Sequence, residues 1–208
     1  MQFSKALGLI ALTVAAGCNL TGDPTNSSFA TPSSSGRLSE ASDGRTGSDF
    51  SFLTGNGYAY QVGAVSNDGL QGFAGIVPGA EVTAAPATGS AQFTGTFEVA
   101  LIGSILTYNT EVSGQTTFDA GTITLTADFD DNTLTGGGTG VDGGSFNYLL
   151  RENVLTIDGD LSGSTLTGTA TYRGVTGPLR GLVGSNEAIG AFHGHTDSQV
   201  HAGGFIAN

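Results

Sequence analysis

The chain has 208 residues, enough for one domain of ordinary size plus tails, and 35 of them are glycine. Charged residues are only 12% and the formal net charge is −12. Such an acidic surface repels phosphate backbones, so nucleic acid is excluded as an expected partner. The single cysteine excludes an internal disulfide. With 38% hydrophobic residues, the chain as a whole is not of the disordered type.

The first segment has the pattern of an export signal. A lysine at position 5 precedes an apolar run, residues 6–16, that is too short to span a bilayer but fits the core of a signal peptide. Small residues then lead into Cys18. This arrangement resembles the lipobox of bacterial lipoproteins. The resemblance implies that residues 1–17 are removed, that Cys18 is acylated, with palmitate among its acyl chains, and that lipid holds the chain to the membrane. Asn19 favours the outer membrane.

Residues 18–49 are expected to form a flexible linker. The stretch is rich in Ser, Thr, Gly and Asp, and Pro24 and Pro32 interrupt it. It has too little apolar surface to offset the entropy of ordering. We therefore predict a disordered tether between the lipid and the folded domain.

From about residue 50 onward the sequence predicts strands and no helix. Residues 50–88 are expected to form a short β-rich region, either a reduced handle or extra strands. Hydrophobic residues then alternate with polar ones, which predicts strands with one apolar and one polar face. The segments are 92–101, 122–129, 154–161, 166–172, 179–184, 188–195 and 200–207. The glycine-rich residues 137–142 are expected to form a hairpin loop.

Glycines inside these strands favour a small closed barrel, in which strands coil sharply and inward side chains are crowded. Closure also removes exposed sheet edges. The predicted fold is therefore all-β: an antiparallel up-and-down barrel of about eight strands, following the tether.

The order of several segments resembles the β-barrel domain of transferrin-binding protein B and related bacterial surface lipoproteins. The segments are 89–97, 125–136, 155–163, and the closing pair Gly190-Ala-Phe-His-Gly194 and Ala202-Gly-Gly-Phe205. The resemblance implies a barrel over residues 89–208. It also implies structural roles for Gly190, Phe192, Gly194, Gly203, Gly204 and Phe205. That family has two lobes, each with a barrel and a handle, whereas this chain has room for one barrel, so no ligand-binding residues are carried over.

All three histidines, His193, His195 and His201, lie near the C-terminus. A His-x-His pair on a strand places both rings on one face, which can bind a metal ion or haem, and His201 could join them across a hairpin. Because Phe192 is expected to face inward, His193 and His195 should face outward. The alternative is that these rings are exposed polar residues of the outer wall.

No nucleophile motif of the Gly-x-Ser-x-Gly type is present, and the paired carboxylates Asp158 and Asp160 fit a solvated face. We therefore expect a monomeric, non-enzymatic lipoprotein of the outer membrane, displayed on the cell surface, without a cofactor unless the histidines bind metal or haem. It would bind a protein or an iron-bearing ligand such as haem. The alternatives are a structural or adhesive envelope lipoprotein and a metal- or haem-binding module built on the histidines.

Overall fold

The computed structural model describes residues 25–38, 45–51, 56–65, 69–104, 114–142 and 153–208. Every regular element in these ranges is a β-strand. Within them, no helix has the length and apolar character needed to cross a membrane. The signal peptide and Cys18 lie outside the described residues.

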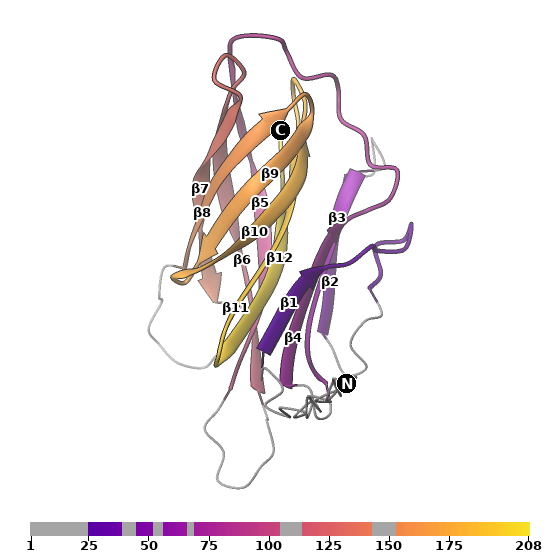
Figure 1. Ribbon diagram of the computed structural model, residues 1–208, viewed down its shortest axis with the longest axis vertical. Coiled ribbons are helices and arrows are strands. Elements are labelled where there is room, and N and C mark those ends of the chain that lie inside the picture. The colour runs from indigo at the N-terminus through magenta and orange to yellow at the C-terminus, as the bar shows by residue number, and fades with distance from the viewer. Residues whose placement is uncertain (1–24, 39–44, 52–55, 66–68, 105–113, 143–152) are drawn as a thin grey trace, which may run out of the picture.

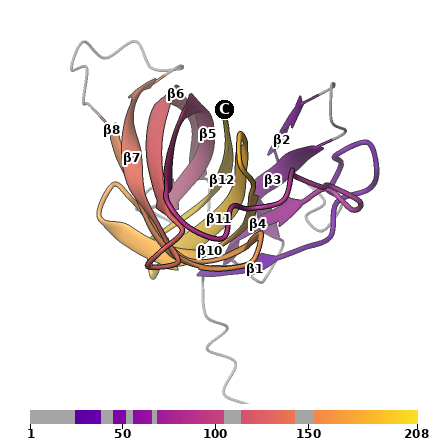
Figure 2. The same cartoon turned by 90° about the horizontal axis from the view of Figure 1, so that it is seen from above.

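Eight strands form a closed barrel (Figures 1 and 2). Each strand pairs antiparallel with the next along the chain, and the last returns to pair antiparallel with the first. The strands are β5 (Ser90–Ser104), β6 (Gly114–Asp128), β7 (Thr133–Asp142), β8 (Asn153–Ser162), β9 (Thr165–Tyr172), β10 (Val175–Val183), β11 (Ala188–Thr196) and β12 (Gln199–Ala207). The predicted all-β, up-and-down barrel is thus confirmed. The loop expected at residues 137–142 is instead part of β7.

A second, four-stranded sheet lies beside the barrel and is called the handle sheet below (Figure 2). Its strands are β1 (Thr25–Phe29), β2 (Arg45–Ser51), β3 (Asn56–Val65) and β4 (Gly69–Ile76), in the order β1-β4-β3-β2. The segment 18–49, expected to be a disordered linker, therefore contains β1 and most of β2. The expectation failed because it counted only apolar side chains, whereas β1 pairs through its backbone, in parallel, with the distant β4.

The barrel interior is filled by one face of every barrel strand. On β10, buried and exposed residues alternate along the whole strand, as expected for a wall with one dry side. The inner core includes Phe93, Phe97, Ile123, Leu125, Leu155, Ile157, Tyr172, Phe192 and Phe205. On the opposite side of the wall, β6 and β9 expose rows of threonines.

A second apolar core joins the handle sheet to the outer face of the barrel. The sheet contributes Tyr58, Tyr60, Val62, Leu70 and Ala74, and the barrel contributes Ala100, Ile102, Ile189, Ala191, Val200, Ala202 and Ile206. The barrel residues come from β5, β11 and β12. Seven consecutive residues of β11 are therefore buried, and the last eight of β12. The expectation of one polar face fails for these two strands, because the handle sheet covers the face that would otherwise be solvated.

Glycines provide the space that this double burial needs. Inside the barrel, Gly190 lies opposite Phe205 and Gly203 lies opposite Phe192, so each ring occupies the room left by a missing side chain. Outside it, the ring of Tyr58 from β3 sits directly on Gly204. A methyl group at Gly204 would overlap that ring and would also lie 2.6 Å from the Gly190 carbonyl oxygen. The handle sheet can therefore approach β12 closely only while residue 204 is glycine.

Asn56 makes a polar connection at one edge of this interface. Its Nδ2 donates to Oε2 of Glu187 at 2.9 Å and to the carbonyl oxygen of Glu81, and its Oδ1 accepts the Glu81 amide at 2.6 Å. Asn56 is fully buried and Glu187 nearly so. One side chain thus links β3, the segment after β4 and the turn before β11.

The substitution Gly204→Ala is expected to lower the free energy of unfolding by about 1–3 kcal/mol, because the added methyl group overpacks the interface. Urea denaturation followed by circular dichroism measures this. Gly103→Ala on β5 is the matched control, since the nearest atom to its new methyl would lie 3.9 Å away. Equal stability of the two variants would contradict the close approach of Tyr58.

The substitution Asn56→Ala should cost about 1–3 kcal/mol of unfolding free energy, because it leaves the Glu187 carboxylate buried with one fewer donor. The control is Asn26→Ala, at an exposed position of β1, for which a change within about 0.5 kcal/mol is expected. If both variants unfold at the wild-type urea concentration, Asn56 does not hold the interface.

Candidate functional site

His193 and His195 lie on the outer face of β11, beneath strand β1 of the handle sheet. The Oγ of Ser27 lies 2.9 Å from Nδ1 of His193 and 2.8 Å from Nδ1 of His195. A hydroxyl has one hydrogen to donate, so Ser27 donates to one ring and accepts from the Nδ1–H of the other. The outward direction expected for both rings is what the structure shows. His195 is exposed, but His193 is only 5% exposed, because β1 covers it.

Aromatic and cationic contacts complete this cluster. The ring of Phe29 meets the His193 ring edge-on at 4.5 Å between centroids, and the Arg180 guanidinium lies 4.4 Å from the Phe29 ring centroid. Burial, with smaller contributions from His195 and Arg180, lowers the pKa of His193 to about 4. His193 is therefore neutral at physiological pH, and the adjacent guanidinium makes this location unfavourable for a metal cation.

His201 lies on the other side of the barrel wall. It is fully buried in the interior, with ring centroids 5.8 Å from Tyr172 and 6.1 Å from Phe192, and its ring fills the space beside Gly194. Neither ring nitrogen bonds to another described residue. Burial, followed by the effects of His193 and His195, lowers the pKa of His201 to about 3.

The structure therefore does not bring the three histidines together. His201 pairs in register with Gly194, and cross-strand partners point to the same side of a sheet, so His201 faces away from His193 and His195. Among the residues that the structure describes, no three histidine, cysteine or acidic side chains are placed to hold a metal ion. The joint metal or haem site considered from the sequence is not assembled.

A buried ion pair beside Tyr172 was not expected from the sequence. The carboxylate of Asp119 on β6 is buried and accepts from Arg173 Nη2 at 3.0 Å, and the guanidinium of Arg173 lies 5.7 Å from the Tyr172 ring centroid. The signal was present, because Asp119 lies in the same alternating row as Ile123 and Leu125, which face inward. A charge in such a row indicates a buried ion pair.

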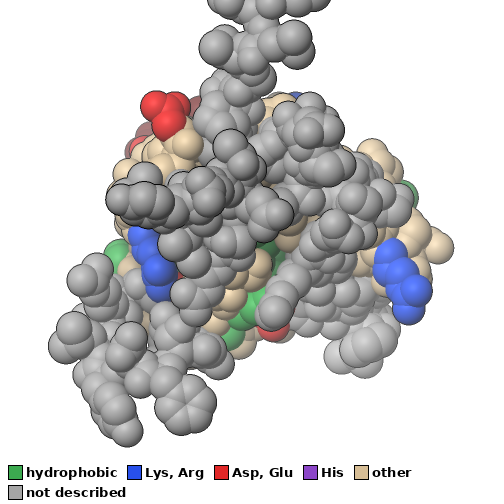
Figure 3. Space-filling view, turned by 90° about the horizontal axis from the view of Figure 1, so that it is seen from below, with side chains coloured by type: hydrophobic (Ala, Val, Ile, Leu, Met, Phe, Trp, Pro, Cys, Tyr) green, Lys and Arg blue, Asp and Glu red, His purple; other side chains and the backbone are tan. Residues whose placement is uncertain are grey.

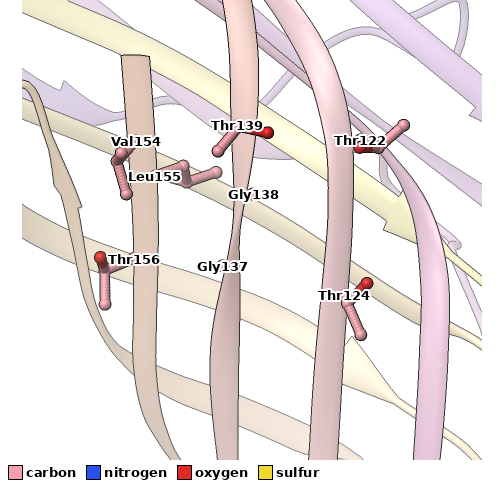
Figure 4. A pocket seen from close by; sticks show the side chains of 8 residues that line it. All are labelled: Thr122, Thr124, Gly137, Gly138, Thr139, Val154, Leu155 and Thr156. Atoms are coloured by element: carbon pink, nitrogen blue, oxygen red, sulfur yellow. The ribbon is translucent and has the colours of Figure 1, made fainter. Parts of the chain in front are cut away.

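The described surface carries open grooves, among them one on the barrel wall and one where the handle sheet meets the barrel. The threonine groove, about 370 Å³, lies on the barrel wall opposite the handle sheet, where glycines leave a gap between rows of threonines (Figure 4). It is lined by Thr122, Thr124, Gly137, Gly138, Thr139, Val154, Leu155 and Thr156.

The junction groove, about 520 Å³, lies where the handle sheet meets β9 and β10. It is lined by Ile76, Ala80, Thr165, Leu166, Thr167, Arg180, Gly181 and Leu182. Local alternation could not reveal this groove, because its two sides are separated by most of the barrel in sequence. In the view from below, hydrophobic side chains lie near the centre of the visible face, and basic side chains lie at two opposite edges (Figure 3).

Because His201 is buried in its neutral form, we expect the protein to lose stability in acid. The unfolded His201 takes up a proton near pH 6.5, whereas the folded one does so only near pH 3. Its contribution is therefore present above pH 6.5 and is lost as the pH falls toward 3, at about 1.4 kcal/mol per pH unit. His201→Leu should make the fall in unfolding free energy between pH 6 and about pH 4 less steep, as measured by urea titrations, and the remaining slope includes the contribution of His193.

His195→Gln is the control for this measurement, since it removes an exposed imidazole and leaves His201 in place. It should keep the acid-dependent slope of the wild type. An unchanged slope in His201→Leu would show that His201 is not the buried neutral group that the structure indicates.

Comparison with known proteins gives structural similarity only. No protein-family model and no curated protein matches the sequence. Among solved structures, a surface lipoprotein is 14% identical with a TM-score of 0.48, covering 81% of this chain and 82% of that one. A point mutant of transferrin-binding protein B from Actinobacillus pleuropneumoniae H49 is 16% identical with a TM-score of 0.46, covering 82% and 83%.

The haemoglobin receptor HpuA from Kingella denitrificans is 18% identical with a TM-score of 0.36, covering 73% of this chain and 55% of that one. Against a transferrin-binding protein B chain from Haemophilus parasuis Hp5, this chain spans only 38% of the length. Transferrin-binding protein B is thus among the solved structures that the chain resembles, as the sequence predicted. The binding activities of those proteins do not carry over with a resemblance at this level.

Proposed function

We propose that this chain is a lipid-anchored protein of the outer membrane that displays its barrel and handle sheet as one non-enzymatic binding unit. The observation that carries the proposal is the continuous apolar core between the handle sheet and strands β5, β11 and β12. It makes the two sheets a rigid platform, which is what positions loops and surfaces for recognition. The lipobox ending at Cys18 supports the anchoring.

The proposed partner is a protein. The chain carries 18 acidic against six basic residues, so electrostatic steering favours a partner with basic patches. Transferrin and haemoglobin are the first probes to use. Transferrin-binding protein B is named for transferrin, and HpuA has been solved in complex with human haemoglobin. A structural or adhesive role in the envelope is the competing proposal, and it requires no captured protein. A haem site shared by all three histidines is not part of the proposal, since the barrel wall separates His201 from the other two.

The anchor is tested by Cys18→Ala in cells grown with labelled palmitate. We expect the wild-type chain to carry the label and the variant to carry none and to leave the membrane fraction, because the thiol is the acylation point. Ser4→Ala, in the signal segment, is the control and should be labelled normally. Labelling of Cys18→Ala would overturn the proposed anchor.

Display and capture are tested separately. Protease added to intact cells should remove the domain while a periplasmic marker survives. In the second experiment, the mature chain on beads should retain transferrin, haemoglobin or another purified host protein saturably. Protection of the domain from protease in intact cells would contradict surface display. Removal by protease without retention of any probe would favour the structural or adhesive role.

A further inference from the structure

The junction groove combines an apolar lining with one positive charge. Ile76 and Ala80 form its handle-sheet side, and Leu182 contributes from β10. Thr165 and Thr167 line the barrel side together with Arg180. This composition differs from the rest of the exposed wall, on which threonine and aspartate dominate.

Arg180 is held in place but is not neutralised. Its guanidinium rests over the ring of Phe29, and no carboxylate of the described residues lies within ion-pair distance of it. Thr167 is its direct neighbour across the β9–β10 ladder, and Asp160 on β8 is the next residue in that row. Two strand spacings separate Asp160 from Arg180, roughly 10 Å. Glu81 follows Ala80, and its carboxylate makes no ion pair with Arg180 either.

We propose that the junction groove binds an aliphatic carboxylate, with the acyl chain along the apolar lining and the carboxylate on the Arg180 guanidinium. The planar fork of arginine donates two parallel hydrogen bonds to a carboxylate, and the contact with the Phe29 ring restricts where the guanidinium lies. The threonine hydroxyls can donate to the same carboxylate.

Charge complementarity selects this class of ligand. With 18 acidic and six basic residues, the chain repels anions over most of its surface, so an unpaired guanidinium beside apolar side chains marks this groove as a place where an apolar anion is favoured. The threonine groove has no charged lining residue and offers no such selection. Each further methylene buried in the junction groove should strengthen binding by roughly fourfold.

The test uses the full mature chain carrying Cys18→Ala, so that no attached lipid competes, and isothermal titration with decanoate, dodecanoate and dodecyltrimethylammonium below their micelle concentrations. We expect saturable one-to-one binding of the carboxylates, tighter for dodecanoate than for decanoate, and no comparable binding of the cation. Absence of saturable carboxylate binding overturns the proposal. Equal binding of the cation also overturns it, because the guanidinium would then play no part.

The variant Thr167→Asp locates the site without removing any existing contact of Arg180. It places a carboxylate directly across the ladder from the guanidinium, and this internal ion pair should weaken dodecanoate binding about tenfold or more. Thr124→Asp, which adds the same charge in the threonine groove, should bind like the parent chain. Thr167→Asn, which removes the hydroxyl without adding a charge, should weaken binding less than Thr167→Asp does. Circular dichroism and urea midpoints establish that all three are folded.

If Thr167→Asp binds dodecanoate as tightly as Thr124→Asp does, the ligand sits elsewhere and the inference fails. This outcome is distinguishable from a failure of the proposed function, because palmitate labelling, protease accessibility and protein capture are measured separately from dodecanoate binding. If the chain bound dodecanoate but retained no protein probe, the carboxylate site proposed in the junction groove would still stand.

Discussion

Strands β11 and β12 are buried on both faces, and this double burial determines where glycine is required and how the two sheets pack. A barrel wall ordinarily has one dry face, yet here aromatic rings fill the inside and the handle sheet covers the outside. Two layers can be packed against one hairpin only if some positions have no side chain. Gly190 and Gly203 make room for rings in the interior, and Gly204 makes room for Tyr58 of the handle sheet. Glycines on the inner face of this hairpin therefore make room for the core rings, and Gly204 on its outer face determines how closely the handle sheet can dock.

Polar groups in this double layer are accommodated by becoming neutral or by pairing. His193 shares the Ser27 hydroxyl with His195, and its low pKa keeps the ring uncharged under β1. His201 is neutral for the same reason in the lumen, and the buried Asp119 carboxylate is paired with Arg173. Because charging the buried rings costs stability, the histidines tie folding to pH rather than providing a shared metal site. Arg180 differs, since it is exposed, held by an aromatic ring and left available at a groove.

The sequence was sufficient for the barrel because alternation is a local signal, and barrel strands such as β10 follow it strictly. It was insufficient for β1 and β2, whose polar residues enter a sheet through long-range backbone pairing that composition does not reveal. The placement of His201 depended on register. A shift of one residue in the pairing of β11 with β12 would have moved its ring to the face of His193, and no residue pattern fixes that register alone. The junction groove needs both sheets, so only the assembled fold shows it.

The common apolar core should make the handle sheet and the barrel one cooperative unit, and native-state hydrogen exchange measures whether they open together. In increasing urea, the slowest amides of β3 and β4 should exchange with the same free energy and the same urea dependence as those of β11 and β12, because opening the handle sheet exposes the core that the two share. Exchange of β3 and β4 through a separate opening of much lower free energy, while β11 and β12 stay protected, would contradict the account.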